Sequence, residues 1–106
     1  MLMEATPVNP TFTFDAELYL WKDDGSWVFV TVPLDVSEEI DDIVPDRKGF
    51  GSVKVDVQIG ATRWDTSIFP DSKSGCFVLP LKKAVRTAEK LDVGDTAEID
   101  LSVRID

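Results

Sequence analysis

Four residues of this chain are the best candidates for binding chemistry: Arg63, Trp64, Asp65 and Arg86. A guanidinium group can hold a carboxylate through two parallel hydrogen bonds, and an indole offers a large apolar surface with a single N–H donor. We predict that these side chains bind a ligand. Two structural alternatives stand beside this prediction: Trp64 fills the core, and Arg86 forms an ion pair with Asp65 or Asp95.

The composition excludes most catalytic schemes because the chain has no histidine. Serine-histidine triads, cysteine-histidine pairs and histidine-ligated zinc sites all need that residue. We therefore assign no catalytic residue, no metal site and no cofactor. An enzyme that combines carboxylates such as Asp65 and Asp95 with Arg63 or Arg86 stays open as an alternative.

Cys76 is the only cysteine, so no disulfide can form within the chain. It follows Gly75 in an apolar stretch, which favours a buried, inert thiol over a thiolate stabilised by Lys83 or Arg86. Residues 1–4 lack the features of an export signal, and no apolar run approaches the ~20 residues of a membrane-spanning helix. We expect a cytoplasmic protein with no membrane partner.

The chain is strongly acidic, and its charge is unevenly distributed. It has 11 basic and 20 acidic residues, a net charge of −9, with eleven acids and three bases in residues 1–50 and nine acids and eight bases in residues 51–106. An acidic chain repels phosphate backbones, so nucleic acid is an unlikely partner. The basic residues concentrate at one place only, Lys82, Lys83, Arg86 and Lys90.

Alternating apolar and polar residues predict six strands, at 11–21, 26–33, 52–59, 62–70, 76–79 and 97–105. In the first strand the alternation places Phe12, Phe14, Ala16, Leu18 and Leu20 on one face, and in the last strand it places every second residue from Ala97 to Ile105 inward. Asp24-Gly25 has the residue types of a two-residue hairpin turn, which would pair Leu20 with Phe29. Gly60-Ala61 is predicted to be a second hairpin turn.

Two short helices are predicted between the strands. Residues 35–44 carry Asp35 and Glu38 at the spacing of an N-cap and its partner, and their run of carboxylates is either a solvated face or a site for a metal or a basic partner. Residues 81–91 place Leu81, Ala84, Val85, Ala88 and Leu91 on one stripe, with Pro80 at the first helical position. We interpret this helix as a plug that packs on the sheet and exposes its lysines.

Six strands of this length leave exposed edges unless the sheet closes on itself. We therefore predict a mainly β fold, a small closed or pseudo β-barrel of six to seven strands with one or two short helices. The whole of residues 1–106 is expected to form one domain, with residues 1–10 as a flexible N-terminal segment.

The sequence resembles the bacterial and archaeal domain-of-unknown-function family DUF1905. The resemblance runs through "FTFDAELYL", "WVFVTVP", "GSVKVDVQIGATRWDTSIFP" and "FVLPLKKAVRTAEKLDVGDTAEIDL". It implies a double-split β-barrel and no particular activity. The same fold class contains the AbrB-like regulators and MazE-like antitoxins, and by that analogy Lys82, Lys83, Arg86 and Lys90 would form a DNA-binding face of a dimer.

Three functions from different classes follow. The leading hypothesis is a non-enzymatic binding domain, monomer or homodimer, that takes a small molecule or a protein at the barrel mouth or the first hairpin, where Trp21 or Trp27 is expected to be exposed. The second is a DNA-binding dimer that uses helix 81–91. The third is the carboxylate and arginine enzyme.

Overall fold

The structure is a computed structural model, and it describes residues 9–20, 27–44 and 51–105. The described chain forms seven strands and two helices. Their order and bounds are β1 (Thr11–Glu17), β2 (Tyr19–Leu20), β3 (Val28–Thr31), α1 (Leu34–Ile43), β4 (Val53–Ile59), β5 (Thr62–Asp71), β6 (Cys76–Pro80), α2 (Lys83–Glu89) and β7 (Thr96–Val103).

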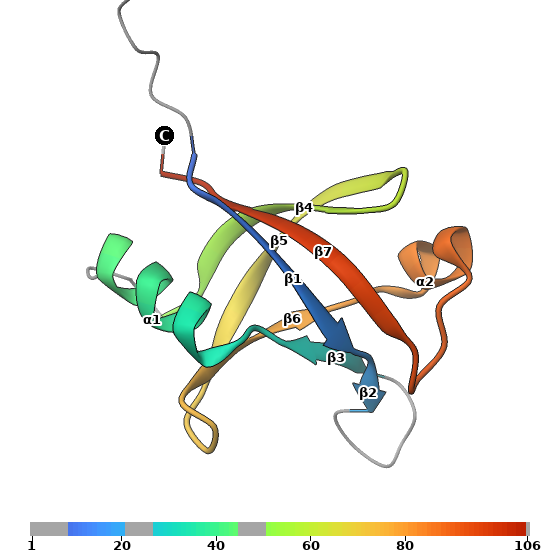
Figure 1. Cartoon of the computed structure of the whole chain (residues 1–106), viewed down its shortest axis with the longest axis horizontal. Coiled ribbons are helices and arrows are strands. Elements are labelled where there is room, and N and C mark those ends of the chain that lie inside the picture. The colour runs from blue at the N-terminus through green and yellow to red at the C-terminus, as the bar shows by residue number, and fades with distance from the viewer. Residues whose placement is uncertain (1–8, 21–26, 45–50, 106) are drawn as a thin grey trace, which may run out of the picture.

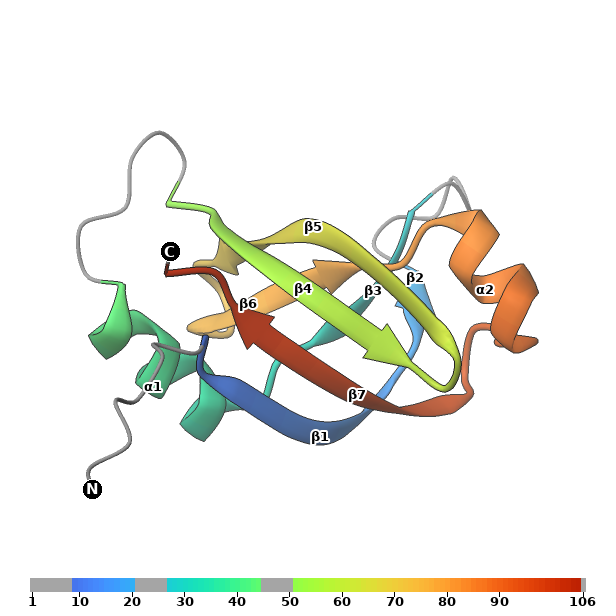
Figure 2. The same ribbon diagram turned by 90° about the horizontal axis from the view of Figure 1, so that it is seen from above.

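The seven strands form one antiparallel sheet in the order β1-β7-β4-β5-β6-β3-β2. Its two outermost strands, β1 and β2, are consecutive in the chain and separated only by Leu18. The sheet therefore curls back towards its own first strand and forms a half-barrel (Figures 1 and 2). This confirms the predicted mainly β barrel or pseudo-barrel with six to seven strands and short helices.

Leu18 is the point at which the chain passes from one end of the sheet to the other. Its side chain is fully buried, and its backbone bonds to the turn that precedes β7. The N–H of Leu18 donates to the carbonyl of Asp95 at 2.9 Å, and its carbonyl accepts from the N–H of Gly94 at 2.8 Å. These bonds satisfy the backbone where β1 ends its pairing with β7 and β2 begins to pair with β3.

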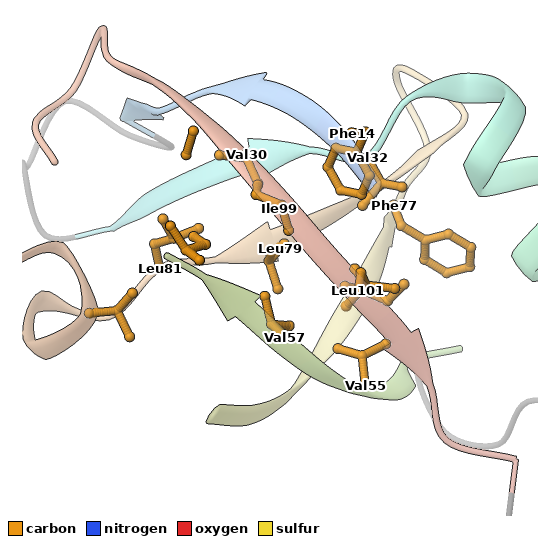
Figure 3. Packing of buried hydrophobic residues seen from close by; sticks show 14 of the residues in the cluster. Phe14, Val30, Val32, Val55, Val57, Phe77, Leu79, Leu81, Ile99 and Leu101 are labelled. Atoms are coloured by element: carbon orange, nitrogen blue, oxygen red, sulfur yellow. The ribbon is translucent and has the colours of Figure 1, made fainter. Parts of the chain in front are cut away.

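The core is supplied most regularly by β4 and β7. Every second residue of 53–59 and of 97–103 is buried, as the alternation predicted. The pairing places Val57 opposite Leu101, and Figure 3 shows both side chains inside the curled sheet. Burial of one such side chain contributes about 1.5–3 kcal/mol, so these two strands hold much of the hydrophobic stabilisation.

Two residues that the alternation placed on the same face as buried residues are exposed. Leu20 is 43% exposed at the end of β2, and Ile105 is 51% exposed beyond the end of β7. Ile105 lies past the last paired residue of its strand, so no neighbouring strand covers it. Alternation assigns a side of the strand, but burial also requires a partner across that side.

The first hairpin pairs one residue away from the predicted register. Leu20 lies opposite Val28, and Tyr19 lies opposite Phe29, whereas a two-residue turn would have paired Leu20 with Phe29. The observed register places the fully buried Leu18 and Val30 on one side of the ribbon. The proposed Asp24-Gly25 turn and Trp21 lie outside the described residues.

Helix α1 packs on the core through Ile40 and through a buried serine. Ser37 is 3% exposed; its hydroxyl donates to the carbonyl of Val32 at 3.1 Å and accepts from the N–H of Phe77 at 3.0 Å. The predicted cap is wrong: the N-cap is Pro33, and no side chain caps the helix. Asp35 already lies in the first turn, where a carboxylate still interacts favourably with the helix dipole.

Helix α2 is shorter than predicted. It begins at Lys83, and Pro80 belongs to β6, where it pairs with Phe29. Val85 is buried, while Ala84 and Ala88 are exposed, so the predicted five-residue apolar stripe is wrong at both alanines. Leu81 is buried just before the helix starts.

The two helices lie at opposite ends of the molecule (Figures 1 and 2). Neither described helix is long and apolar enough to cross a membrane. Of the predicted N-terminal segment, residues 1–8 lie outside the described residues, whereas the Asn9 side chain accepts from the N–H of Ile105 and the Pro10 carbonyl accepts from the N–H of Val103.

Candidate functional site

Strand β5 divides the predicted binding residues between two faces of the sheet. Arg63 and Asp65 are exposed on the outer face, and Trp64 points the other way and packs against the core. The alternation of the strand predicted this division. Trp64 is only partly buried, and it lines two surface grooves.

The outer face carries a groove of about 750 Å³. We call it the outer groove; its charged and amide side chains come from the segment before β1, from β4, β5 and β7, and from the residue that follows β7, namely Asn9, Asp56, Gln58, Arg63, Asp65, Asp100 and Arg104. The groove thus brings together three of the four predicted residues, Arg63, Trp64 and Asp65.

Several polar side chains of the outer groove already pair with one another. Arg63 Nε donates to the Gln58 side chain at 3.2 Å, and Arg104 Nε lies 3.8 Å from the carboxylate of Asp56. Asp65 stands directly opposite Asp56 in the β4–β5 pairing, which is an unfavourable like-charge arrangement. The groove has three carboxylates beside two arginines, so it has no excess of positive charge for an anion.

A second groove of about 650 Å³ lies between α2 and the sheet. We call it the α2 groove and define it by six side chains from the residue before β3, from β5, from the link after β6 and from α2, namely Trp27, Trp64, Leu81, Lys82, Lys83 and Arg86. Trp64 lines both grooves, but Arg86 lines only this one. The four predicted residues therefore do not form a single site.

Helix α2 is held on the sheet at both of its ends. Before the helix, the N–H of Leu81 donates to the carbonyl of Val28 at 2.9 Å. Inside it, Val85 is 3% exposed. At its last residue, Glu89 accepts a hydrogen bond of 2.5 Å from the hydroxyl of Thr62 on β5. These contacts fix the wall of the groove that carries the basic residues.

Arg86 does not form the ion pair that we considered for it. Its Nε donates to the carbonyl of Leu81 at 3.1 Å, and neither Asp65 nor Asp95 contacts it. The carboxylate of Asp95 instead accepts from the N–H of Asp92 in the turn before β7. One edge of the guanidinium is thus anchored to the backbone, and within the described chain its two Nη groups have no partner.

The indole nitrogen of Trp64 is a buried donor without an acceptor. Among buried side-chain nitrogens and oxygens of the described residues, Nε1 of Trp64 alone lacks a hydrogen bond. Leaving a buried donor unsatisfied costs about 1–3 kcal/mol. Buried tryptophans usually find a partner for this group, so its absence in a side chain that lines a groove is notable.

Trp27 supplies the aromatic wall of the α2 groove. It is 55% exposed, and its ring stacks on that of Phe29 with a centroid distance of 6.2 Å and an interplanar angle of 28°. The expectation that a tryptophan of the first hairpin is exposed is thus confirmed for Trp27. An indole backed by a second ring is a large, rigid apolar surface.

The α2 groove also differs from the outer groove in its charge. Three cations line it, Lys82, Lys83 and Arg86, and no carboxylate does so among the residues that the structure describes. Both lysines are exposed and form no ion pair there. In a chain of net charge −9 this local excess of positive charge marks the groove as the part best suited to an anion.

A comparison with protein-family models matches residues 14–101 to a single family, described as Domain of unknown function (DUF1905). The chain belongs to the DUF1905 family. The match spans β2 to β6 and both helices, together with most of β1 and β7, so it includes Arg63, Trp64 and Arg86. Among curated proteins, no sequence matches the chain.

The remaining chemistry-bearing groups in the described part of this DUF1905 chain do not assemble into a site. Cys76 is a free thiol, partly buried, at the start of β6. It lines a small recess below α1 together with the carboxylates of Glu38, Asp41 and Asp71, and no cation lines that recess among the described residues. Neither Lys83 nor Arg86 lines it, so the activation considered for this thiol has no structural basis.

The carboxylates considered for an enzyme lie apart in this DUF1905 chain. Asp65 lines the outer groove, whereas Asp95 lies in the turn before β7 and lines neither groove. In the described ranges no group of three metal-ligating side chains is found either. The carboxylates of α1 are exposed on its surface, as the solvated-face interpretation predicted.

Sequence reasoning did not select three of the residues that shape the α2 groove of this DUF1905 chain. Lys82 and Lys83 were interpreted as a solvated face, and Thr66 was not considered. The signal that could have identified the lysines was the isolated basic concentration at residues 82–90. No local signal connects the two lysines with Trp27, because more than fifty residues separate them in the chain.

Proposed function

We propose that this chain is a non-enzymatic binding module and that its binding site, the α2 groove, takes a small ligand with a negative charge. The observation that carries the proposal is the set of three cations, Lys82, Lys83 and Arg86, in a groove that no described carboxylate lines. Attraction between these cations and an anion is stronger at the edge of a low-dielectric core than in open solvent.

The size of the groove favours a small molecule over a protein. A volume of about 650 Å³ falls within the range of small-molecule sites, about 300–1,000 Å³. A stable protein partner buries roughly 800 Å² on each side, over a patch of 20–30 residues.

Binding to DNA stays a weaker alternative. Non-specific affinity for DNA comes from phosphate neutralisation, and four basic residues of a chain with net charge −9 provide little of it. A titration with duplex DNA at low salt tests this alternative directly. A DNA affinity that falls steeply with salt and is lost in Lys90→Gly, a residue that does not line the groove, would favour it over the small ligand.

The role of charge is tested with benzoate and its neutral isostere benzamide. We expect benzoate to shift the amide resonances of residues 81–86 in a heteronuclear NMR titration, and benzamide to bind several-fold more weakly. Lys83→Gln should raise the Kd for benzoate roughly threefold, because it removes one partly screened charge from the groove. AMP and ribose 5-phosphate are titrated in parallel.

Lys73→Gln is the matched control, because it removes the same charge from an exposed loop that does not line the groove. The proposal fails if none of the anions shifts the resonances of residues 81–86, if benzamide binds as well as benzoate, or if Lys73→Gln weakens binding as much as Lys83→Gln.

Two other expectations stay predictions: the cytoplasmic location, tested by cell fractionation, and the monomer or homodimer, tested by sedimentation.

A further inference from the structure

We infer that the ligand of the α2 groove is a flat aromatic ring that bears an anionic group, with the ring against Trp27, the anion on Arg86 and Lys83, and Trp64 as a hydrogen-bond donor. This inference rests on the proposed function and adds the class of ligand to it. Aromatic carboxylates and aromatic phosphates, including nucleoside phosphates, share this chemistry.

The case for a ring begins with the wall opposite α2. Trp27 keeps 55% of its surface exposed, although its indole is already stacked on Phe29. Val28, Pro80 and Leu81 continue this wall with apolar side chains. A flat ring can cover such a surface in an offset or edge-to-face arrangement without rearranging it, because Phe29 holds the indole from behind.

The position of the anion follows from Arg86. Its Nε is committed to the carbonyl of Leu81, which fixes the plane of the guanidinium relative to the groove. The two Nη groups, free of partners in the described chain, then present the fork that binds a carboxylate or a phosphate with two parallel hydrogen bonds. Lys83 lies one turn earlier on α2 and adds a second charge.

Trp64 contributes a donor that the folded chain leaves unused. Its Nε1–H is covered by protein atoms and has no acceptor among the described residues. Trp64 also lines the α2 groove, so an acceptor on a bound ligand is the partner that we assign to this group. A ligand hydrogen bond to this donor contributes strongly to the binding free energy, because folding has already removed the N–H from water.

The ring requirement is tested by comparing benzoate with cyclohexanecarboxylate, which has the same charge and nearly the same size but is not flat. AMP is compared with ribose 5-phosphate in the same way. We expect each ring-bearing anion to bind about twofold to twelvefold more tightly than its partner, the range that aromatic contacts contribute.

The role of Trp64 is tested by the indole Nε1–H resonances of the ¹⁵N-labelled full chain. The Trp64 resonance is assigned by its loss in Trp64→Phe. We expect benzoate to move this resonance downfield as the N–H gains an acceptor, a change that a purely structural tryptophan would not show. Trp64→Phe should then weaken benzoate several-fold while the fold, checked by its amide spectrum, is kept.

The role of Trp27 is tested by Trp27→Leu, which keeps an apolar group but removes the aromatic platform. We expect it to abolish the preference for benzoate over cyclohexanecarboxylate. Leu34→Ala is the control, because Leu34 is 53% exposed on α1 at the other end of the molecule. Both positions are exposed, so neither variant should unfold the chain.

The outcomes separate the inference from the proposal beneath it. If benzoate and cyclohexanecarboxylate bind equally well and both depend on Lys83, the anion site stands and the aromatic class is overturned. If benzoate binds with the Trp64 resonance unmoved, the donor role of Trp64 is overturned. If no anion binds, the proposed function itself fails.

Discussion

The hydroxyl of Thr62 on β5 donates a hydrogen bond of 2.5 Å to the carboxylate of Glu89 at the last residue of α2. The bond is partly buried and joins the β4–β5 hairpin to the helix that forms one wall of the α2 groove. The orientation of the groove therefore depends on a contact between two residues that are 27 positions apart in the chain.

Thr62→Val should lower the free energy of unfolding by about 1–2 kcal/mol, because it keeps the shape of the side chain and removes a partly buried bond to a charged group. Urea denaturation measures this change. Thr13→Val is a matched control: the Thr13 hydroxyl donates to Asp100 at 2.6 Å, but this pair is exposed and its loss should cost less. Equal losses in the two variants would contradict the role assigned to the Thr62–Glu89 bond.

Gly60→Ala should destabilise the chain more than Gly75→Ala. Both glycines have positive φ, of 56° and 77°, so alanine is strained at either position. Only at Gly60 does the added Cβ run into the carboxylate of Glu89 and displace it from Thr62. The expected excess is the ~1–2 kcal/mol of that bond.

The displacement at Gly60 can be isolated with Glu89→Ala. In that background the clash and the bond are both absent, so Gly60→Ala should cost no more than Gly75→Ala. An undiminished excess in the double variant, measured by urea denaturation, would show that the strain lies in the turn itself and not in its contact with α2.

Val85→Asp should destabilise the chain by several kcal/mol, roughly 3 or more, because it places an unpaired charge at a position that is 3% exposed. Ala84→Asp, on the exposed side of the same helix, should leave the melting temperature nearly unchanged. Thermal unfolding followed by circular dichroism distinguishes the two. If Ala84→Asp were as damaging as Val85→Asp, the packing of α2 given by the structure would be wrong.

Ser37→Ala should cost about 1–3 kcal/mol, because it removes a buried hydroxyl that satisfies both the Val32 carbonyl and the Phe77 N–H. The change in the urea midpoint at constant m-value measures this loss. Ser74→Ala is the comparison: its hydroxyl also bridges two groups, Asp71 and the N–H of Cys76, but in an exposed loop where water can replace it. A silent Ser37→Ala would contradict the role of this serine in holding α1.

The inward and outward sides of the strands were predictable from the sequence. The assignment is correct for β4 and for residues 97–103, and it also separates Arg63 and Asp65 from Trp64 on β5. It succeeds because successive side chains of a strand point to opposite faces, so the pattern depends only on local geometry. The resemblance to DUF1905 was likewise confirmed.

The helices were predicted less well. For α2 the apolar stripe was correct at Val85 and wrong at Ala84 and Ala88. Burial of an alanine side chain contributes little free energy, so an alanine on the stripe is a weak indicator of where the helix contacts the sheet. For α1 a cap was predicted at Asp35, although the helix starts earlier, at Leu34.

The sequence by itself therefore determined the strands, their buried faces and the basic concentration on the last helix, all of which are properties of neighbouring residues. Only the tertiary structure decided that Arg86 bonds to a backbone carbonyl, that Asp65 and Arg86 belong to different grooves, and that Trp27 faces the basic end of the molecule. These contacts arise because the curled sheet brings β3, β5 and α2 together. A periodic pattern along the chain predicts which side of a strand is buried, but it does not predict which distant residues become neighbours when the sheet curls.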